Sequence, residues 1–104
     1  MKIDFSTMLK GFDGEPIRDG NGNTITLGSA VVVALTAPRS EDSRTSGEEK
    51  FKLGELARVV WQSEKNSQSA DIPVEDVAVI KAAVGKSWST LVVWSAFRII
   101  EGLT

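Results

Sequence analysis

The chain has 104 residues, of which 41% are apolar and 25% are charged, a balance that predicts one globular domain spanning residues 1–104. It contains no cysteine and no histidine, which excludes disulfides, thiolate catalysis and the commonest protein ligands of zinc, copper and iron. Twelve Lys and Arg residues are interleaved with 14 Asp and Glu residues, so the chain lacks the basic block that non-specific nucleic-acid binding requires.

Residues 15–27 are predicted to form a β-hairpin. The runs "EPIR" and "TITL" are short and rich in strand-forming residues, and "DGNGN" between them consists of residues that tolerate positive φ. Residues 4–9, "DFSTML", fit a third strand or a turn of helix equally well. No internal repeat is visible.

The same turn raises the question of a calcium site. Asp19, Asn21 and Asn23 are spaced two residues apart, as are the first oxygen ligands of an EF-hand loop. That loop also requires a glycine at its sixth position and a glutamate at its twelfth, where this chain has Thr24 and Ala30. The segment is therefore predicted to be a tight turn without a metal.

The middle of the chain predicts two helices separated by a loop. Residues 30–37 suit a short helix capped by Ser29 and ended by Pro38, although their valine run would also suit a buried strand. Residues 38–47 contain no apolar side chain and predict a mobile loop. From 48 to about 62 an amphipathic helix is predicted, because apolar residues recur at helical spacing at Leu53, Leu56, Ala57, Val60 and Trp61.

Residues 63–71 are polar and small and are interpreted as a linker, after which two further helices are predicted. The first runs from about 74 to 84 and should end near Gly85, with Lys81 outward. Its predicted core face is Val77, Ile80 and Val84. The second runs from about 89 to 101, with Gly102 as its stop.

The last helix is apolar on more than one side. The face predicted to be inward consists of Val93, Trp94, Phe97 and Ile100, which leaves an outward stripe of Val92, Ala96 and Ile99. Trp88, in the preceding turn, is the best candidate for an exposed aromatic anchor. The candidate partner-binding residues are therefore Trp88, Val92, Ala96 and Ile99.

Two patterns near Gly85 resemble functional motifs but have simpler interpretations. "GKS" at 85–87 matches the end of a phosphate-binding P-loop, but Ile80 occupies the position of the first glycine, and a helical pattern precedes it instead of a strand. Residues 77–97 fit a DNA-binding helix-turn-helix as a second possibility. The would-be recognition helix offers "SWSTLVVW", which has no Arg, Lys, Asn or Gln to read a base edge, so an antiparallel helical hairpin is preferred.

These elements predict an α+β fold, with an N-terminal β-hairpin packed on three or four helices and a C-terminal helical hairpin. The N-terminus lacks the apolar run of a secretory signal, and the longest apolar stretch, 91–100, is too short to span a membrane. We therefore expect no membrane association and a location in the cytoplasm of the cell.

The segments "DGEPI", "TLG", "LARVV", "IKAAVGKSWSTLVV" and "IIEG", taken in order, resemble a group of small proteins encoded by bacteriophages and prophages. In that group the turn is often "DGKPI…DGxxLTLG" and the end often "LIKxxVGKxYxxLVVGxxxxLLE". This chain departs from the pattern at Trp88, where the group has tyrosine, and at Trp94, where it has glycine. The resemblance implies a phage setting, with the cytoplasm of a bacterial host cell as the expected location and the virion as an alternative, and no assigned activity or catalytic residues.

Together these observations favour a non-enzymatic phage or prophage protein without a cofactor. It would act by binding another protein, of phage or host origin, in virion assembly or in modulation of a host factor, or by forming a homo-oligomer. The alternative is a small helix-turn-helix regulator that binds DNA through residues 77–97, although a nucleic-acid partner is not expected.

Overall fold

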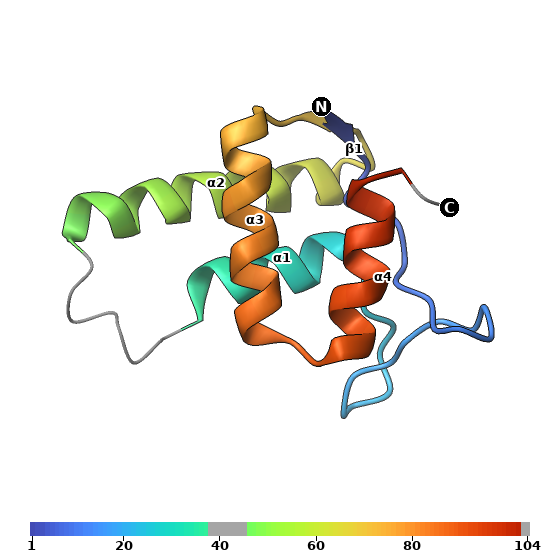
Figure 1. Ribbon diagram of the computed structural model, residues 1–104. Coiled ribbons are helices and arrows are strands. Elements are labelled where there is room, and N and C mark those ends of the chain that lie inside the picture. Colours follow the sequence, from blue (N-terminus) through green and yellow to red (C-terminus); the bar gives the residue numbers. More distant parts are fainter. Residues whose placement is uncertain (38–45, 103–104) are drawn as a thin grey trace.

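The computed structural model describes residues 1–37 and 46–102, whose course is shown in Figure 1. Within these residues the chain forms four helices and one two-stranded sheet, which confirms the mixed α+β class. The elements are β1 (Lys2–Ile3), α1 (Leu27–Thr36), α2 (Gly47–Lys65), β2 (Ala70–Asp71), α3 (Val74–Ser87) and α4 (Thr90–Ile100). Most of the loop predicted at 38–47 lies outside the described residues. Its end differs from the prediction, because Ser46 caps α2 and Gly47 begins it.

Residues 4–26, which we name the N-terminal wrap, form isolated β-bridges instead of continuous strands. Three backbone hydrogen bonds, each 2.9 Å long, close a ring in which Leu9 donates to Ile25, Ile25 to Ile17 and Ile17 to Leu9. Leu9 and Ile25 are buried and Ile17 packs against the core. The ring gives these backbone groups the partners that a regular sheet would otherwise supply. The undecided segment 4–9 is neither strand nor helix, since a turn at its start leads into one of the bridges.

The predicted hairpin turn is present, and a second turn of the same type precedes it. The N–H of Asp19 donates to the carbonyl of Asn23 at 2.8 Å, and Gly22 adopts φ +83°. Eight residues earlier, Gly11 donates to Glu15 at 2.9 Å and Gly14 adopts φ +81°. Both are three-residue hairpin loops with a left-handed glycine at the end. An eight-residue structural repeat therefore exists, which the sequence interpretation missed.

Helix α1 begins three residues earlier than predicted. Thr26 is its N-cap, and the Thr26 hydroxyl accepts the N–H of Ser29 at 3.1 Å while the Ser29 hydroxyl accepts the N–H of Thr26 at the same distance. Ser29 is thus the third helical residue of a capping box and not the cap itself. The N–H groups of Leu27 and Gly28, the first two residues of the helix, donate to backbone carbonyls of the wrap at 2.8 Å. The valine run is helical, and Pro38 lies outside the described residues.

Helix α2 packs beside α1, and its C-terminal end reaches the start of α1 (Figure 1). The Glu64 carboxylate accepts a hydrogen bond from the Thr26 hydroxyl. A Cβ atom placed on Gly28 would lie 2.8 Å from Cδ and 3.0 Å from Cβ of Glu64. The absence of a side chain at Gly28 therefore permits this close approach of the two helices. Helix α2 includes residues 63–65, which the sequence interpretation assigned to the linker.

Helix α3 packs across α1, and α4 returns antiparallel beside α3 (Figure 1). Gly85 does not end α3, which continues to Ser87 and is capped by Trp88, whose N–H donates to the carbonyl of Val84 at 3.2 Å. The predicted inward face of α3 is confirmed, since Val77, Ile80 and Val84 are buried. The predicted end of α4 is also confirmed, because Gly102 follows it at φ +73°.

The buried apolar side chains of the described residues form one core cluster to which every helix contributes. Its largest fully buried members come from the wrap, from each of α1, α2 and α3, and from the connection between β2 and α3. They are Phe5, Leu9, Leu27, Val31, Val60, Ile72, Ile80 and Val84. The short sheet, in which Lys2 lies opposite Asp71 and Ile3 opposite Ala70, ties the N-terminus to the start of α3.

Candidate functional site

The buried face of α4 differs from the predicted one. Val92 is 5% exposed and Ala96 is 0% exposed, so these two candidate partner-binding residues lie in the core and their assignment to an outward stripe is wrong. Ile99 is half-buried against the core. Of the four residues predicted to face inward, Ile100 is buried, whereas the other three are only half-buried.

Ser95 lies on the buried face of α4 and contacts the N-terminal wrap. Its side chain is buried, and its hydroxyl accepts the backbone N–H of Lys10 in the N-terminal wrap at 3.0 Å. Small residues such as Ser95 and Ala96 allow backbone segments to approach closely, whereas the bulky Trp94 does not. Hydrophobicity alone favoured the aromatic residues as the inward face. The wrap instead packs on the side of α4 that carries Ser95.

Trp88 is half-buried and is not an exposed anchor. Its indole N–H donates to the carbonyl of Ala30 in α1 at 2.9 Å, and its ring packs against the core. A buried indole needs such a partner for its N–H. Trp88 therefore connects the turn between α3 and α4 to α1, which is a structural role.

The outer side of α4 carries aromatic and cationic groups that contact one another. Phe12, at the tip of the first wrap turn, meets Trp94 edge-on with ring centroids 4.5 Å apart, and the Arg98 guanidinium lies 5.2 Å from the Trp94 ring centroid. The Lys81 ammonium lies 4.9 Å from the Phe97 ring and forms an ion pair with Glu101. Within the described residues, two of the cations that the DNA-binding alternative would use are thus engaged within the chain.

Exposed apolar side chains gather instead in a groove between α2 and α3. The groove has a volume of about 680 Å³. We name it the α2–α3 groove, and its apolar lining consists of Phe51, Leu53, Leu56, Val59, Ile72, Pro73 and Val79. Phe51 is 67% exposed, Val59 41% and Val79 39%, although all three are large apolar residues on well-formed helices.

The predicted apolar face of α2 accounts for only part of this lining. Leu53 and Leu56 belong to the predicted apolar face of α2 and lie at the edge between core and groove. Trp61, predicted on the same face, is 50% exposed and stacks with Lys65, whose ammonium lies 4.8 Å from the ring centroid. The missed signal is the pair Phe51 and Val59, which lie eight residues apart beside the main face and give α2 a second apolar stripe.

The groove carries mainly negative charge. Its charged lining residues are Glu49, Lys52, Glu55, Asp71 and Asp76, that is, four carboxylates and one ammonium group. Two of the carboxylates have partners within the chain. Glu55 pairs with Arg58 at 2.9 Å, and Asp71 pairs with the Met1 ammonium at 2.9 Å.

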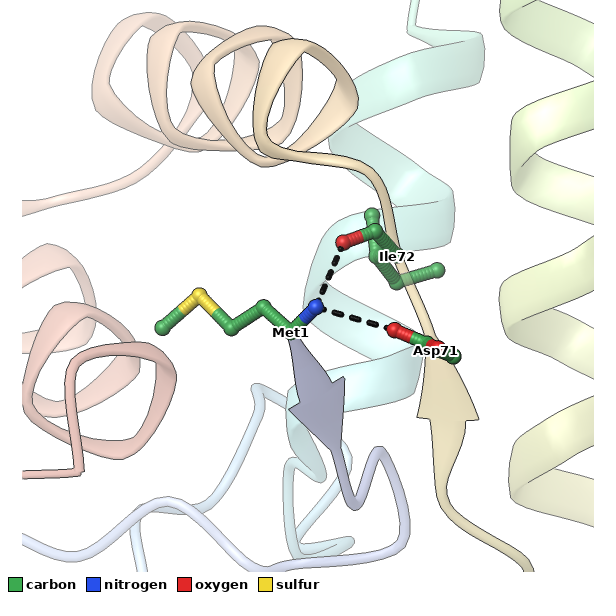
Figure 2. Close-up of polar contacts among 3 residues, drawn as sticks. All are labelled: Met1, Asp71 and Ile72. Atoms are coloured by element: carbon green, nitrogen blue, oxygen red, sulfur yellow. Dashed lines mark hydrogen bonds and ion pairs between the residues drawn. The ribbon is translucent and has the colours of Figure 1, made fainter.

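Asp71 fixes the N-terminus at one end of the groove. Figure 2 shows the Met1 ammonium between the Asp71 carboxylate and the carbonyl of Ile72, to which it donates at 3.1 Å. The hydrogen bond and the attraction from this ammonium lower the pKa of the Asp71 carboxyl below its usual value. Because the Asp71 side chain is 74% exposed, water screens much of this attraction.

The oxygen-rich segment 18–29 contains one carboxylate, that of Asp19, which accepts hydrogen bonds within the turn. The Asp19 carboxylate accepts the backbone N–H groups of Asn21 at 2.9 Å and Asn23 at 3.0 Å, which fixes the loop residues in the turn conformation. Among the described residues no group of three or more acidic, histidine or cysteine side chains is arranged to hold a metal ion.

The "GKS" motif lies in the last turn of α3, so these residues are helical and do not form a loop after a strand. In the part of the chain that the structure describes, no helix is long and apolar enough to cross a membrane.

Comparison of the chain with models of known protein families gave no match, and searches of curated proteins and of solved structures gave no significant match either.

Proposed function

We propose that this protein is a non-enzymatic binding protein that receives a segment of another polypeptide in the α2–α3 groove. The observation that carries the proposal is the exposure of Phe51, Val59 and Val79 around one concave site. Contiguous apolar surface of this kind marks interaction sites in soluble proteins. The resemblance to small phage and prophage proteins suggests a phage or host protein as the partner.

The energetics favour a groove over isolated surface residues. Fully burying a Val or Phe side chain contributes about 1.5 to 3 kcal/mol. The three exposed lining residues are already partly covered, so each would contribute less, and association itself has an entropic cost. Leu53, Leu56 and Ile72 line the same groove and belong to the core or pack against it, so little ordering of the protein is needed on binding.

The helix-turn-helix alternative has weaker support. It depends on cations near residues 77–97, and two of these, Lys81 and Arg98, contact Phe97 and Trp94 within the protein. Their release for phosphate contacts would require those contacts to break. We therefore place the function in protein binding and not in DNA binding.

The proposal is tested by site-specific photo-crosslinking in phage-producing bacterial cells. A benzophenone amino acid replaces Val59 in the groove or, as the matched control, Val33, which is 49% exposed on α1. We expect a discrete protein adduct from position 59 and none from position 33. An absence of adducts at position 59, or equal labelling at both positions, would contradict docking in this groove.

A further inference from the structure

This inference rests on the proposed function and concerns the occupant of the groove. We infer that the α2–α3 groove takes an amphipathic helix whose apolar stripe is flanked by lysine or arginine side chains. The occupant belongs to a different protein and is not a second copy of this chain.

The shape of the groove favours a helix. Its walls are the helices α2 and α3, and an apolar groove of this kind can receive the apolar face of an amphipathic helix. An extended segment would instead need a free strand edge for backbone hydrogen bonds. The adjacent strand β2 has only two residues and already pairs with β1, so it offers little such edge.

The charge of the groove favours a basic helix. Of its four carboxylates, Glu55 and Asp71 are paired within the chain, whereas Glu49 and Asp76 have no ion-pair partner among the described residues. Glu49 lies on the α2 wall and Asp76 on the α3 wall, so carboxylates border the apolar lining on both sides. Basic side chains that flank an apolar stripe complement this arrangement.

The same charges disfavour a second copy as the occupant. In a two-fold dimer the same surface patch is used by both subunits. Two copies of this groove placed face to face would bring acidic walls together, and Lys52 is the one lysine in the lining that would oppose them. Like charges placed together across an interface weaken it, whereas a basic partner meets no such penalty.

The probes for the test are two synthetic helices that share one leucine-rich face. One carries lysine and the other glutamate at the flanking positions. Binding is followed by amide chemical shifts of the full-length chain, which report the location as well as the affinity. We expect the lysine peptide to bind about tenfold or more tightly than the glutamate peptide at low salt. Its shifts should map to α2 and the first half of α3.

Variants separate the groove from the general negative charge of the chain. Glu49→Lys combined with Asp76→Lys should reverse the preference between the peptides, with an unchanged helical circular dichroism spectrum as the check on folding. Val79→Asn should weaken lysine-peptide binding about tenfold or more, because a polar amide would enter the apolar contact without a change in charge. Val33→Asn, the matched control on α1, should leave binding unchanged.

Three results would overturn the inference. Equal binding of the two peptides would show that the groove does not prefer basic flanks. Failure of both to bind at millimolar concentration would show that the occupant is not a helix of this kind. Self-association of the chain that Val59→Asp abolishes would make a second copy the occupant. In the first two cases a crosslink from position 59 to a different protein would still support the proposed function, and in the third the mass of the adduct would identify a second copy. Failure of this inference is therefore distinguishable from failure of the proposed function.

Discussion

The contact between Gly28 and Glu64 gives a sharp prediction, because the usual effect of replacing a helical glycine should change sign there. In the interior of a helix, alanine is more favourable than glycine by about 0.5 to 1 kcal/mol. At Gly28, however, the new methyl group would lie 2.8 Å from Cδ and 3.0 Å from Cβ of Glu64. Real Cβ atoms essentially never approach another atom more closely than 3.0 Å, so Glu64 must move.

Movement of Glu64 has two costs. The carboxylate end of Glu64 can rotate away at low cost, but its Cβ must also give way, so overpacking should cost about 1 kcal/mol, the low end of the usual range. Displacement of the carboxylate also breaks its hydrogen bond with the Thr26 hydroxyl, which contributes about 1 kcal/mol. After subtraction of the helix preference for alanine, Gly28→Ala should lower the free energy of unfolding by about 1 to 1.5 kcal/mol.

The assay is urea denaturation followed by circular dichroism, with Gly85→Ala as the control. A Cβ atom on Gly85, in α3, would meet no atom within 4 Å, so this variant should be stabilised by about 0.5 to 1 kcal/mol. Combining Gly28→Ala with Glu64→Ala should recover about 1 kcal/mol or more of the loss, as a double-mutant cycle would measure. If Gly28→Ala stabilises the protein as much as Gly85→Ala does, the close packing of α1 against α2 is refuted.

Two further predictions follow from the burial of α4 and from the N-terminal ion pair. Val92→Asp should lower the free energy of unfolding by about 3 kcal/mol or more, because a carboxylate would enter the core. Thermal denaturation checks this against Val33→Asp, which should change stability by less than about 1 kcal/mol. Equal effects of the two substitutions would indicate that Val92 faces outward, contrary to the structure. The folded-state pKa of Asp71 is lowered, so its stabilising effect is present above the pKa of the unfolded chain and is lost as the pH falls through the folded value. The stability difference between the parent and Asp71→Asn should therefore shrink as the pH falls through and below the ordinary range of an aspartate carboxyl, as measured by denaturation at several pH values, whereas a constant difference would contradict the ion pair.

Local chemistry made several features readable from the sequence. The turn at 19–23 follows from residues that tolerate positive φ, and Gly22 adopts it. The helix at 48–62 follows from its 3.6-residue apolar period, which does not depend on what the helix packs against. The end of α4 at Gly102 follows from the preference of glycine for the left-handed conformation.

The N-terminal wrap was only partly readable. Its turns are local, but the ring of Leu9, Ile17 and Ile25 joins backbone groups that are eight and sixteen residues apart in the sequence. Apolar residues separated by eight, with a glycine five residues after each of the first two, are a weak signal that single positions do not reveal. The pairing became evident only from the backbone hydrogen bonds.

The inward faces of α4 and the location of the groove were decided by tertiary structure alone. Apolar residues occur on several sides of α4, so hydrophobicity did not determine which side the wrap would cover, and the wrap packs on the side that carries Ser95. Phe51 and Val79 come from helices whose relative placement depends on Gly28 and on the N-terminal strand, far away in the sequence. A periodic pattern specifies the faces of one helix, whereas the surface left uncovered depends on how all the helices pack together.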